Sequence, residues 1–347
     1  MLPEGAPRAS GMADVAAHAG VSHQTVSRVV NGHPNVAPAT RERVLAAIAE
    51  LGYRPNTAAR ALVTGSTRTI GLVTSHINQY GPAQILLGLE KAARAAGYSL
   101  GVAILDEDSD SAMREAVDRF VAQSVDAVVA LSTYSQAVES LGRLEAAVPL
   151  VAVQVGRDPS RPTVWVDQEA GAALATRHLL GLGHRTVHHV TGPADSLEAR
   201  GRVLGWQREL RAVGAPVPEV VQGTWWPASG YAAGRALVAR RRAGEGLTAV
   251  FVANDQMAIG VLNAFHEEGL AVPDDVSVVG FDDVPEAAYY TPPLTTVRQD
   301  FTELGRRGVQ AVLARLGGQE FAAEPVAPQL VVRASTGPAR VMVTGAV

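Results

Sequence analysis

The alternation of short apolar runs with longer amphipathic stretches from residue 70 onward restricts the fold more than any other feature of this chain. The runs are continuously apolar, which is typical of strands buried on both faces of a parallel sheet covered by helices. There are more strand–helix units than one ordinary sheet needs, so we expect two stacked α/β subdomains with a cleft between them. The predicted strands are 70–75, 100–105, 127–131, 150–155, 186–191, 249–253 and 276–281, and the predicted helices lie near 82–97, 111–123, 136–146, 169–181, 197–213, 228–242, 255–269 and 303–316.

The region before residue 70 differs from the rest in pattern and in charge. Residues 12–51 are alanine-rich and helical with two interruptions, and residues 54–68 have the composition of a linker. Residues 1–64 contain six arginines and four acidic residues, a net charge of +2, whereas the whole chain has 30 Lys+Arg against 34 Asp+Glu and a net charge of −4. This change of sign and the length of 347 residues predict separate domains.

The composition excludes several classes of protein. The chain has no cysteine, so disulfides, zinc ribbons and cysteine nucleophiles are excluded. Residues 1–10 lack the apolar stretch of a secretory signal, and the chain has no apolar run of about 18 residues that could span a membrane. We therefore expect a cytoplasmic protein that does not act at a membrane.

Residues 12–30, MADVAAHAGVSHQTVSRVV, have the pattern of a helix-turn-helix. Ala16 is small where two helices would cross, Gly20 permits a left-handed turn, and Val26 supplies a branched side chain to the shared core. Ser22 is a good N-cap for the second helix. Each feature alone is weak, but together they predict this motif.

The outward face of the second helix carries side chains that can read DNA. Gln24 and Arg28 are four residues apart and project together, and they can pair with adenine and guanine, respectively. The alternative is an ordinary solvated face, but the position on a helix-turn-helix favours DNA. We expect base contacts from His23, Gln24 and Arg28, and phosphate contacts from Ser22, Thr25, Ser27, Asn31, Tyr53 and Asn56.

A third helix from Pro38 to Leu51 and a short hinge helix complete the predicted head. The third helix is expected to close the core through Val44, Leu45 and Ile48. Asn56 can cap a helix at 57–63, but about eight residues are too few to be helical alone in water, so this helix needs DNA or a second copy as its partner. Leu62, beside Ala59, is either an ordinary linker leucine or a wedge that enters the minor groove and kinks the duplex.

The stretches DVAAHAGVSHQTVSRVVNG and VAPATRERVLAAIAELGYRPNTAARAL together resemble the DNA-binding head and hinge of the LacI/GalR family of transcriptional regulators. The resemblance implies that His23, Gln24 and Arg28 read bases and that Leu62 is the minor-groove leucine. Two positions depart from the family pattern, because Gly11 and Ala37 replace its polar helix caps.

The resemblance continues to about residue 336 through VANDQMAIG, SVVGFDDVPEAAYYTPPLTTVRQDF and TGPADSLEARGRVLGW. It implies an α/β chain with an N-terminal three-helix helix-turn-helix domain and hinge helix, then a sensor of two subdomains like those of periplasmic sugar-binding proteins. The expected boundaries are a flexible tail at 1–10, the DNA-binding domain at 11–54, the hinge at 55–69, the sensor at 70–337 (subdomains about 70–166 with 297–325, and 167–296 with 326–337) and a tail at 338–347.

Three polar residues of the sensor are placed to bind a ligand in the cleft. Asn254 and Asp282 each follow an apolar strand, and Arg202 lies early in a helix. The carboxyl ends of parallel strands are where α/β folds bind ligands, and these side chains offer the paired donors and acceptors that vicinal hydroxyls need. The alternative is that Asp282 and Asp283 cap a helix. We expect Asp255 to be the N-cap residue of a helix at 256–268, which leaves Asn254 for the ligand.

Other cleft residues would supply apolar surface or complete the wall. Trp225 and Phe301 can cover the C–H face of a sugar ring, although core packing is an equal alternative for Trp225. Gln154 ends the strand LVAVQ, and Trp226 is a core or surface residue. The resemblance places Ser75, Pro82 and Ile85 on the opposite side of the cleft.

Two acidic or histidine-rich patterns imitate metal sites. Asp106, Asp108 and Asp110 open like a calcium loop but lack its glycine and final glutamate. The three histidines within 184–189 lie at a predicted strand, where their side chains do not converge as helical zinc ligands do. No paired base and nucleophile is visible. We therefore expect no metal, no cofactor and no enzymatic activity.

These observations predict a DNA-binding transcriptional regulator, a repressor of carbohydrate-utilisation genes whose effector is a sugar or glycoside. A homodimer would bind a pseudo-palindromic double-stranded operator. A sugar is favoured over a purine because only 5% of residues are aromatic and could sandwich a base. The alternatives are a sugar-binding protein without a regulatory role, a sugar-acting enzyme, and a regulator with a purine or other non-sugar effector.

Overall fold

The computed structural model describes residues 10–54, 61, 64–106, 109–131, 148–154, 162–322 and 324–340. The chain divides into two compact units, Met1–Thr67 and Arg68–Val347. The predicted helix at 136–146 and most of the predicted hinge helix lie outside the described residues. None of the described helices is both long and apolar enough to cross a membrane.

The first unit contains the three helices of the predicted head, α1 (Met12–Ala19), α2 (His23–Val30) and α3 (Pro38–Glu50). Gly20 ends α1 with a φ of 63°, the left-handed conformation expected for the turn. The Ser22 hydroxyl accepts a hydrogen bond from the Thr25 amide at 3.2 Å and caps α2. The apolar faces of the three helices form one core of Val15, Ala16, Ala19, Val26, Val29, Val44, Ala47 and Tyr53.

The structure corrects the prediction that Leu45 packs inward from the third helix. Leu45 is 51% exposed, whereas Val44 beside it is fully buried. Successive helical residues point about 100° apart, so the two neighbours cannot both face the same small core. Ala47 fills the corresponding place one turn further along α3.

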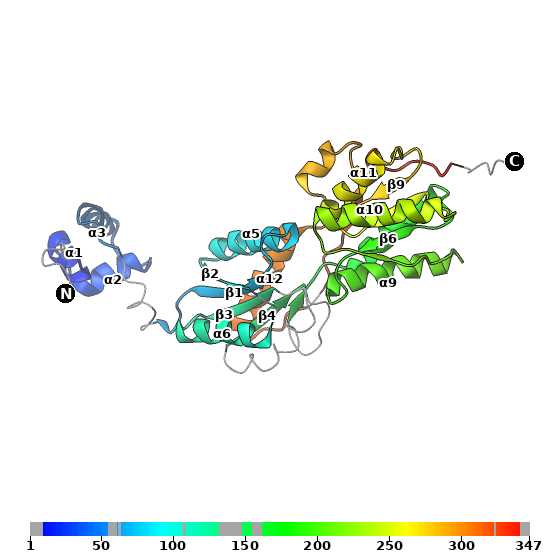
Figure 1. Cartoon of the computed structure of the whole chain (residues 1–347). Coiled ribbons are helices and arrows are strands. Elements are labelled where there is room, and N and C mark those ends of the chain that lie inside the picture. The colour runs from blue at the N-terminus through cyan, green and yellow to red at the C-terminus, as the bar shows by residue number, and fades with distance from the viewer. Residues whose placement is uncertain are drawn as a thin grey trace, which may run out of the picture. The chain divides into compact units, whose positions relative to one another are not determined.

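The second unit begins with a five-stranded parallel sheet in the order β2-β1-β3-β4-β5. One face is covered by α5 and α12, through a core that includes Ile70, Leu89 and Leu304. The other face is covered by α6, through a core that includes Val73, Val117 and Phe120; Figure 1 shows α5 and α6 on opposite sides of the sheet. The elements are β1 (Thr69–Ser75), α5 (Tyr80–Ala95), β2 (Ser99–Leu105), α6 (Asp110–Ala122), β3 (Ala127–Leu131), β4 (Leu150–Val153), β5 (Thr163–Val164) and α12 (Phe301–Leu316).

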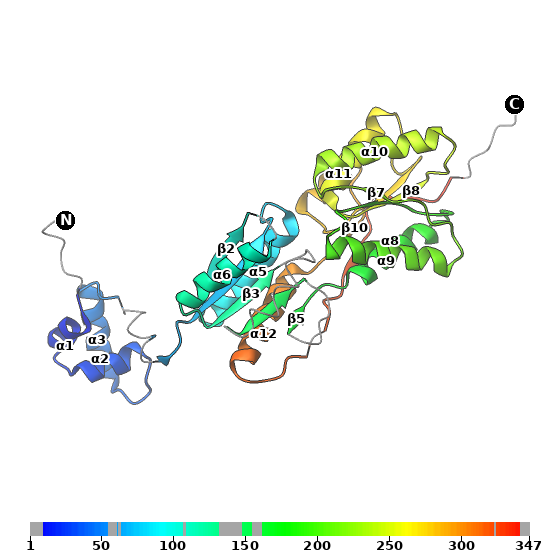
Figure 2. The ribbon, with the colours of Figure 1, turned by 60° about the horizontal axis from the view of Figure 1, so that its bottom comes forward.

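A second parallel sheet follows in the order β7-β6-β8-β9. Helices α10 and α11 cover one face and α8 and α9 the other, as Figure 2 shows. Buried aromatic residues such as Trp206, Phe251 and Phe265 fill the two cores. The elements are α8 (Gln168–Gly181), β6 (His188–Thr191), α9 (Leu197–Ala212), β7 (Val221–Gln222), α10 (Pro227–Arg242), β8 (Ala249–Val252), α11 (Asp255–Glu267) and β9 (Ser277–Val279).

The chain passes between the two sheets three times, which places their edges close to each other. It crosses from β5 to α8, returns between β10 (Thr296–Arg298) and α12, and crosses again from α12 to β11 (Gln329–Val331). The antiparallel pair β10–β11 joins the second and third crossings. A bridge between Val166 and Val326 joins the first and third. A short 3₁₀ helix, Pro285–Tyr289, follows β9. The second unit therefore has two parallel α/β subdomains, as the sequence predicted.

Candidate functional site

Polar side chains that follow three strands of the second sheet meet at a cleft between the two subdomains. Arg202 lies in the first half of α9, Asn254 follows β8, and Asp282 follows β9, so all three stand beyond the carboxyl ends of parallel strands. They line one small cavity together with Trp225, and Tyr80 and Pro82 on α5 supply its opposite wall. Its free space of about 20 Å³ is enough for one water molecule. The cleft is therefore closed around its polar groups, and a ligand larger than water enters only when the two subdomains move apart.

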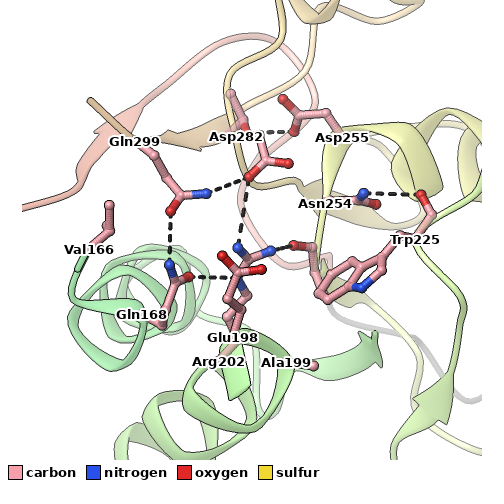
Figure 3. Close-up of polar contacts among 12 residues, drawn as sticks. Val166, Gln168, Glu198, Ala199, Arg202, Trp225, Asn254, Asp255, Asp282 and Gln299 are labelled. Carbon is pink, nitrogen blue, oxygen red and sulfur yellow. Dashed lines mark hydrogen bonds and ion pairs between the residues drawn. The ribbon is translucent and has the colours of Figure 1, made fainter. Parts of the chain in front are cut away.

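Hydrogen bonds and aromatic rings hold the Arg202 guanidinium in place, and Figure 3 shows its polar contacts. Its Nε donates to the Gln168 side-chain oxygen at 2.9 Å, and its Nη1 donates to the Ala253 carbonyl oxygen. The guanidinium carbon lies 3.9 Å from the Phe281 ring centroid and 5.3 Å from that of Trp225. Only 2% of the residue is exposed. A planar cation held between hydrogen bonds and aromatic faces is a rigid donor for a ligand.

This cation is one member of a closed ring of four polar side chains. The Asp282 carboxylate lies 3.8 Å from Arg202 Nη2 and accepts a hydrogen bond of 2.6 Å from the Gln299 side-chain amide. The Gln299 oxygen in turn accepts from Gln168 at 2.9 Å, and Gln168 accepts from Arg202. Gln168 opens α8 and Gln299 precedes α12, both at crossings between the subdomains. These two glutamines were not predicted from the sequence, because neither follows a strand of the second sheet.

Burial changes the acidity of the cleft carboxyl groups. It raises the pKa of Asp282 to about 6, although Arg202 and the hydrogen bond from Gln299 oppose the shift. Burial also raises the pKa of Glu198, the second residue of α9, to about 7; Arg202 opposes this shift and the charge of Asp282 adds to it. The two carboxyl groups therefore exchange protons close to neutral pH.

The structure corrects the assignment of the cap of α11. Asn254 is the N-cap residue, and its side-chain oxygen accepts from the Met257 amide at 2.8 Å. Its side-chain amide also donates to the Trp225 carbonyl at 3.1 Å. Asp255, the predicted cap, instead turns inward, and its carboxylate accepts a hydrogen bond from the Val284 amide at 2.9 Å. Asparagine and aspartate are equally good N-cap residues, so residue type does not decide which of the two caps α11. Asp255 is used in its buried hydrogen bond with Val284, and Asn254 is left as the cap.

Trp225 both packs in the core and lines the cavity. It is 5% exposed and has a φ of 75°, and its ring lies against Gly192, where any side chain would collide with it. Trp226 next to it is 39% exposed and is the N-cap residue that precedes α10. Core packing of Trp225 is thus confirmed, and its contact with a ligand stays a prediction that its place in the cavity lining permits.

The remaining predicted ligand residues all belong to the first subdomain. Pro82 lines the cavity, whereas Ser75, Ile85 and Phe301 are buried and are not among its lining residues. The Phe301 ring meets the ring of Tyr80 edge-on, with centroids 5.9 Å apart, and so supports a residue that does line it. Gln154, 3% exposed, lines a neighbouring cavity instead. Across the part of the chain that the structure describes, no cluster of histidine and acidic residues could hold a metal ion.

The head presents the predicted base-reading residues on one face of α2. His23, Gln24 and Arg28 are exposed, and Val26 and Val29 face the core. Of the predicted phosphate contacts, Ser22 and Asn31 are exposed, Thr25 and Ser27 are half-buried, and Tyr53 is a 7% exposed core residue. Asn56, Ala59 and Leu62 lie outside the described residues.

Comparison with known proteins gives consistent matches over nearly the whole chain. A family model for bacterial regulatory proteins of the lacI family matches residues 11–56, and one for a periplasmic binding protein-like domain matches residues 176–336. The lactose operon repressor of Escherichia coli K12 is 36% identical over 329 residues, covering 93% of this chain and 89% of that protein. The transcriptional repressor PurR of Haemophilus influenzae PittEE is 33% identical over 334 residues, covering 93% of this chain and 97% of that protein. A crystal structure of the lac repressor dimer bound to operator and the anti-inducer ONPF matches with a TM-score of 0.87 at 35% identity, over 95% of this chain and all of that one.

Proposed function

Because the chain belongs to the lacI family of bacterial regulatory proteins, we propose that it represses carbohydrate-utilisation genes and that a sugar or glycoside in the cleft controls its operator binding. The chain is a DNA-binding transcriptional repressor and not an enzyme. The genes that it regulates and the chemical class of its effector are the proposed part.

The arrangement of Arg202, Asp282 and Asn254 is the observation that carries the sugar assignment. A fixed guanidinium beside a carboxylate and an amide matches adjacent hydroxyl groups, which each donate and accept one hydrogen bond. Trp225 closes the same cavity with an apolar face. Polar groups that can hydrogen-bond to hydroxyls, placed beside one aromatic ring, are typical of a sugar-binding site.

Operator recognition is assigned to the exposed face of α2 and to the hinge. His23, Gln24 and Arg28 would contact base edges, and Asn56, Ala59 and Leu62 would act at the hinge in the minor groove. A homodimer places two heads on the half-sites of a pseudo-palindromic duplex, and the matched lac repressor is a dimer on its operator.

The route from cleft to head follows β1. This strand begins at Thr69, directly after the predicted hinge, and ends at Ser75, shortly before Gln79 and Tyr80 of the cavity wall. A ligand that prefers one cleft geometry over another shifts the population of that geometry, and β1 carries the change to the hinge. Operator affinity and effector affinity are then coupled by the same factor in both directions.

A purine effector is the second candidate. It is supported by the similarity to PurR, which reaches 33% identity over most of both chains. Trp225 and Tyr80 line opposite walls of the cavity around Arg202 and could stack on a base. The groups beside them, Arg202, Asn254 and Asp282, offer the paired donors and acceptors that adjacent hydroxyls need, and we therefore favour the sugar.

The test measures DNA binding and effector binding in one experiment. A duplex selected from a random pool by the full-length protein is labelled, and its dissociation constant is measured with sugars, purines and phosphorylated sugars. The sugar proposal predicts that one sugar changes the operator dissociation constant, that Arg202→Ala abolishes this response, and that Arg211→Ala retains it, because Arg211 is exposed on α9 and lines neither cavity of the cleft. A response to a purine alone would overturn the sugar assignment and leave the repressor intact.

A further inference from the structure

A second and larger cavity lies next to the Arg202 cavity. It has a volume of about 620 Å³ and lies between the crossing after β5 and the first half of α9. Its lining includes Trp165, Gln168, Leu204 and Arg208, together with Gln154 and Glu198. Glu198 lines both cavities, so the two spaces meet at this residue. The size falls within the range of about 300–1,000 Å³ that is usual for small-molecule sites.

The hydrogen bond between Gln154 and Glu198 stands at the junction. The Gln154 side-chain amide donates to the Glu198 carboxyl oxygen at 2.8 Å. The Gln154 oxygen accepts from the Val166 amide at 3.1 Å, which fixes the amide so that its nitrogen faces Glu198. Gln154 follows β4 in one subdomain and Glu198 belongs to α9 in the other. A ligand that extends from one cavity to the other must pass this pair.

We propose that the effector is a neutral oligosaccharide of at least two rings, with one ring at Arg202 and the next in the cavity lined by Trp165. This proposal rests on the proposed function, because it specifies which class of sugar the cleft binds. Gln154 and Glu198 lie where the two rings join and exchange their mutual hydrogen bond for bonds to the sugar hydroxyls.

The walls of the larger cavity match a sugar ring. Trp165 is half-buried and Leu204 is 53% exposed, so both present apolar surface to solvent in the absence of ligand. Aromatic and aliphatic faces of this kind pack against the C–H face of a pyranose. The rim carries an ion pair between Arg208 and Glu169, with 3.2 Å between nitrogen and oxygen, which offers further polar partners.

The charge at the junction favours a neutral ligand. Glu198 is half-buried and Asp282 is buried, and both lie near Arg202, the one basic side chain among the described residues that line this cavity. A phosphate group placed between these two carboxyl groups would meet like charge wherever they are ionised, which disfavours its binding. Hydroxyl groups carry no such penalty and satisfy both carboxyl oxygens and amides.

The test compares matched sugars on full-length protein by isothermal titration calorimetry. The probes are glucose and galactose with cellobiose, maltose, lactose and melibiose, and glucose 6-phosphate as the anionic member. The proposal predicts that one disaccharide binds more tightly than its component monosaccharides and that glucose 6-phosphate does not bind. Trp165→Ala should weaken the disaccharide by about tenfold and leave the monosaccharide unchanged. Trp165→Phe should retain most of the affinity because it keeps an aromatic face.

The control is Trp226→Ala, since Trp226 is 39% exposed and lines neither cavity. It should bind mono- and disaccharides like the parent. Equal affinity for a disaccharide and its monosaccharide, unchanged by Trp165→Ala, would overturn the two-ring proposal while the sugar-controlled repressor stands. Binding of purines but of no sugar would overturn the proposed effector class itself, so the two failures are distinguishable.

Discussion

Arg202 and Asp282 face each other in the cleft, with Nη2 and Oδ1 3.8 Å apart and with only 3% and 9% of their side chains exposed. The pair is long for a direct ion pair, and each partner is held by a glutamine at a subdomain crossing, Arg202 by Gln168 and Asp282 by Gln299. Because the two glutamines also bond to each other, the binding groups and the crossings form one ring of hydrogen bonds. A change in the angle between the subdomains therefore has a direct path to the ligand-binding side chains.

Arg202→Ala should destabilise the sensor as well as abolish effector binding. The change leaves the Asp282 carboxyl group buried without its cation, and breaking a buried pair in this way typically costs about 3–5 kcal/mol. The loss should be greatest at pH 8 and smaller at pH 5, because Asp282 can then take up a proton. Urea unfolding at both pH values measures it, with Arg208→Ala as the exposed control. Equal losses for the two variants would contradict a special role for the buried pair.

Glu198→Gln should make the protein more stable than the parent at pH 8. Burial raises the pKa of Glu198 from 4.5 to about 7, so the folded chain keeps a proton that the unfolded chain has already released. The unfolding free energy of the parent therefore falls as pH rises from 4.5 to 7 and levels off above that range. A glutamine side chain carries no charge and has no such loss, so Glu198→Gln should have a free energy of unfolding higher than the parent by on the order of 3 kcal/mol at pH 8.

The pH dependence of that difference distinguishes charge from packing. The stability gain of Glu198→Gln over the parent should shrink to about 0.4 kcal/mol near pH 4.5, where the folded carboxyl is protonated and the unfolded one is half protonated. Burial lowers the pKa of His189 to about 4, which adds an opposite slope to both proteins, so the difference between variants is the quantity to follow. A stability gain that is the same at pH 4.5 and pH 8 would show that the carboxyl charge is not its cause.

The sequence predicted the large features of the fold because they have a local period. All seven strands predicted from continuous apolar runs are present, with ends that differ by a few residues. The strands β5, β7, β10 and β11 were missed because two or three residues are too few to show a pattern. Leu45 and Asp255 were misassigned for a related reason: each has a neighbour of the same type, and only the packed structure decides which of the two faces inward.

The cleft was predictable only where its residues follow strands. Arg202, Asn254 and Asp282 were singled out by their position after a strand or turn and Trp225 by its aromatic side chain, and the structure places all four around one cavity. The ring that supports them was not foreseen, since Gln168 and Gln299 are 131 residues apart and carry no local signal. Glu198 was also missed, because an acidic residue in the first turn of a helix is ordinary.

Ala37→Ser should stabilise the head by about 1 kcal/mol. Ala37 is the N-cap of α3, with φ −54° and ψ 136°, and has no side-chain cap hydrogen bond. A serine there can accept from the free amides of the first turn, as Ser22 does for α2. Amide hydrogen exchange along α3, without DNA, measures the gain, and Ser22→Ala should lower protection of α2 by a similar amount. Unchanged exchange in both variants would mean that caps do not limit the stability of these helices.

Ile104→Asp should convert the proposed dimer into a monomer. Val102 and Ile104 on the edge strand β2 are 45% and 52% exposed, and Leu87 on the adjacent α5 is 57% exposed, so this side of the first subdomain presents apolar surface to solvent. Specific interfaces bury such surface, and a charge placed inside one must be desolvated without a partner. Sedimentation equilibrium at micromolar protein should give the mass of two chains for the parent and of one chain for Ile104→Asp. Leu204→Asp, equally exposed on α9, should stay a dimer, and dissociation by both variants or by neither would refute this interface.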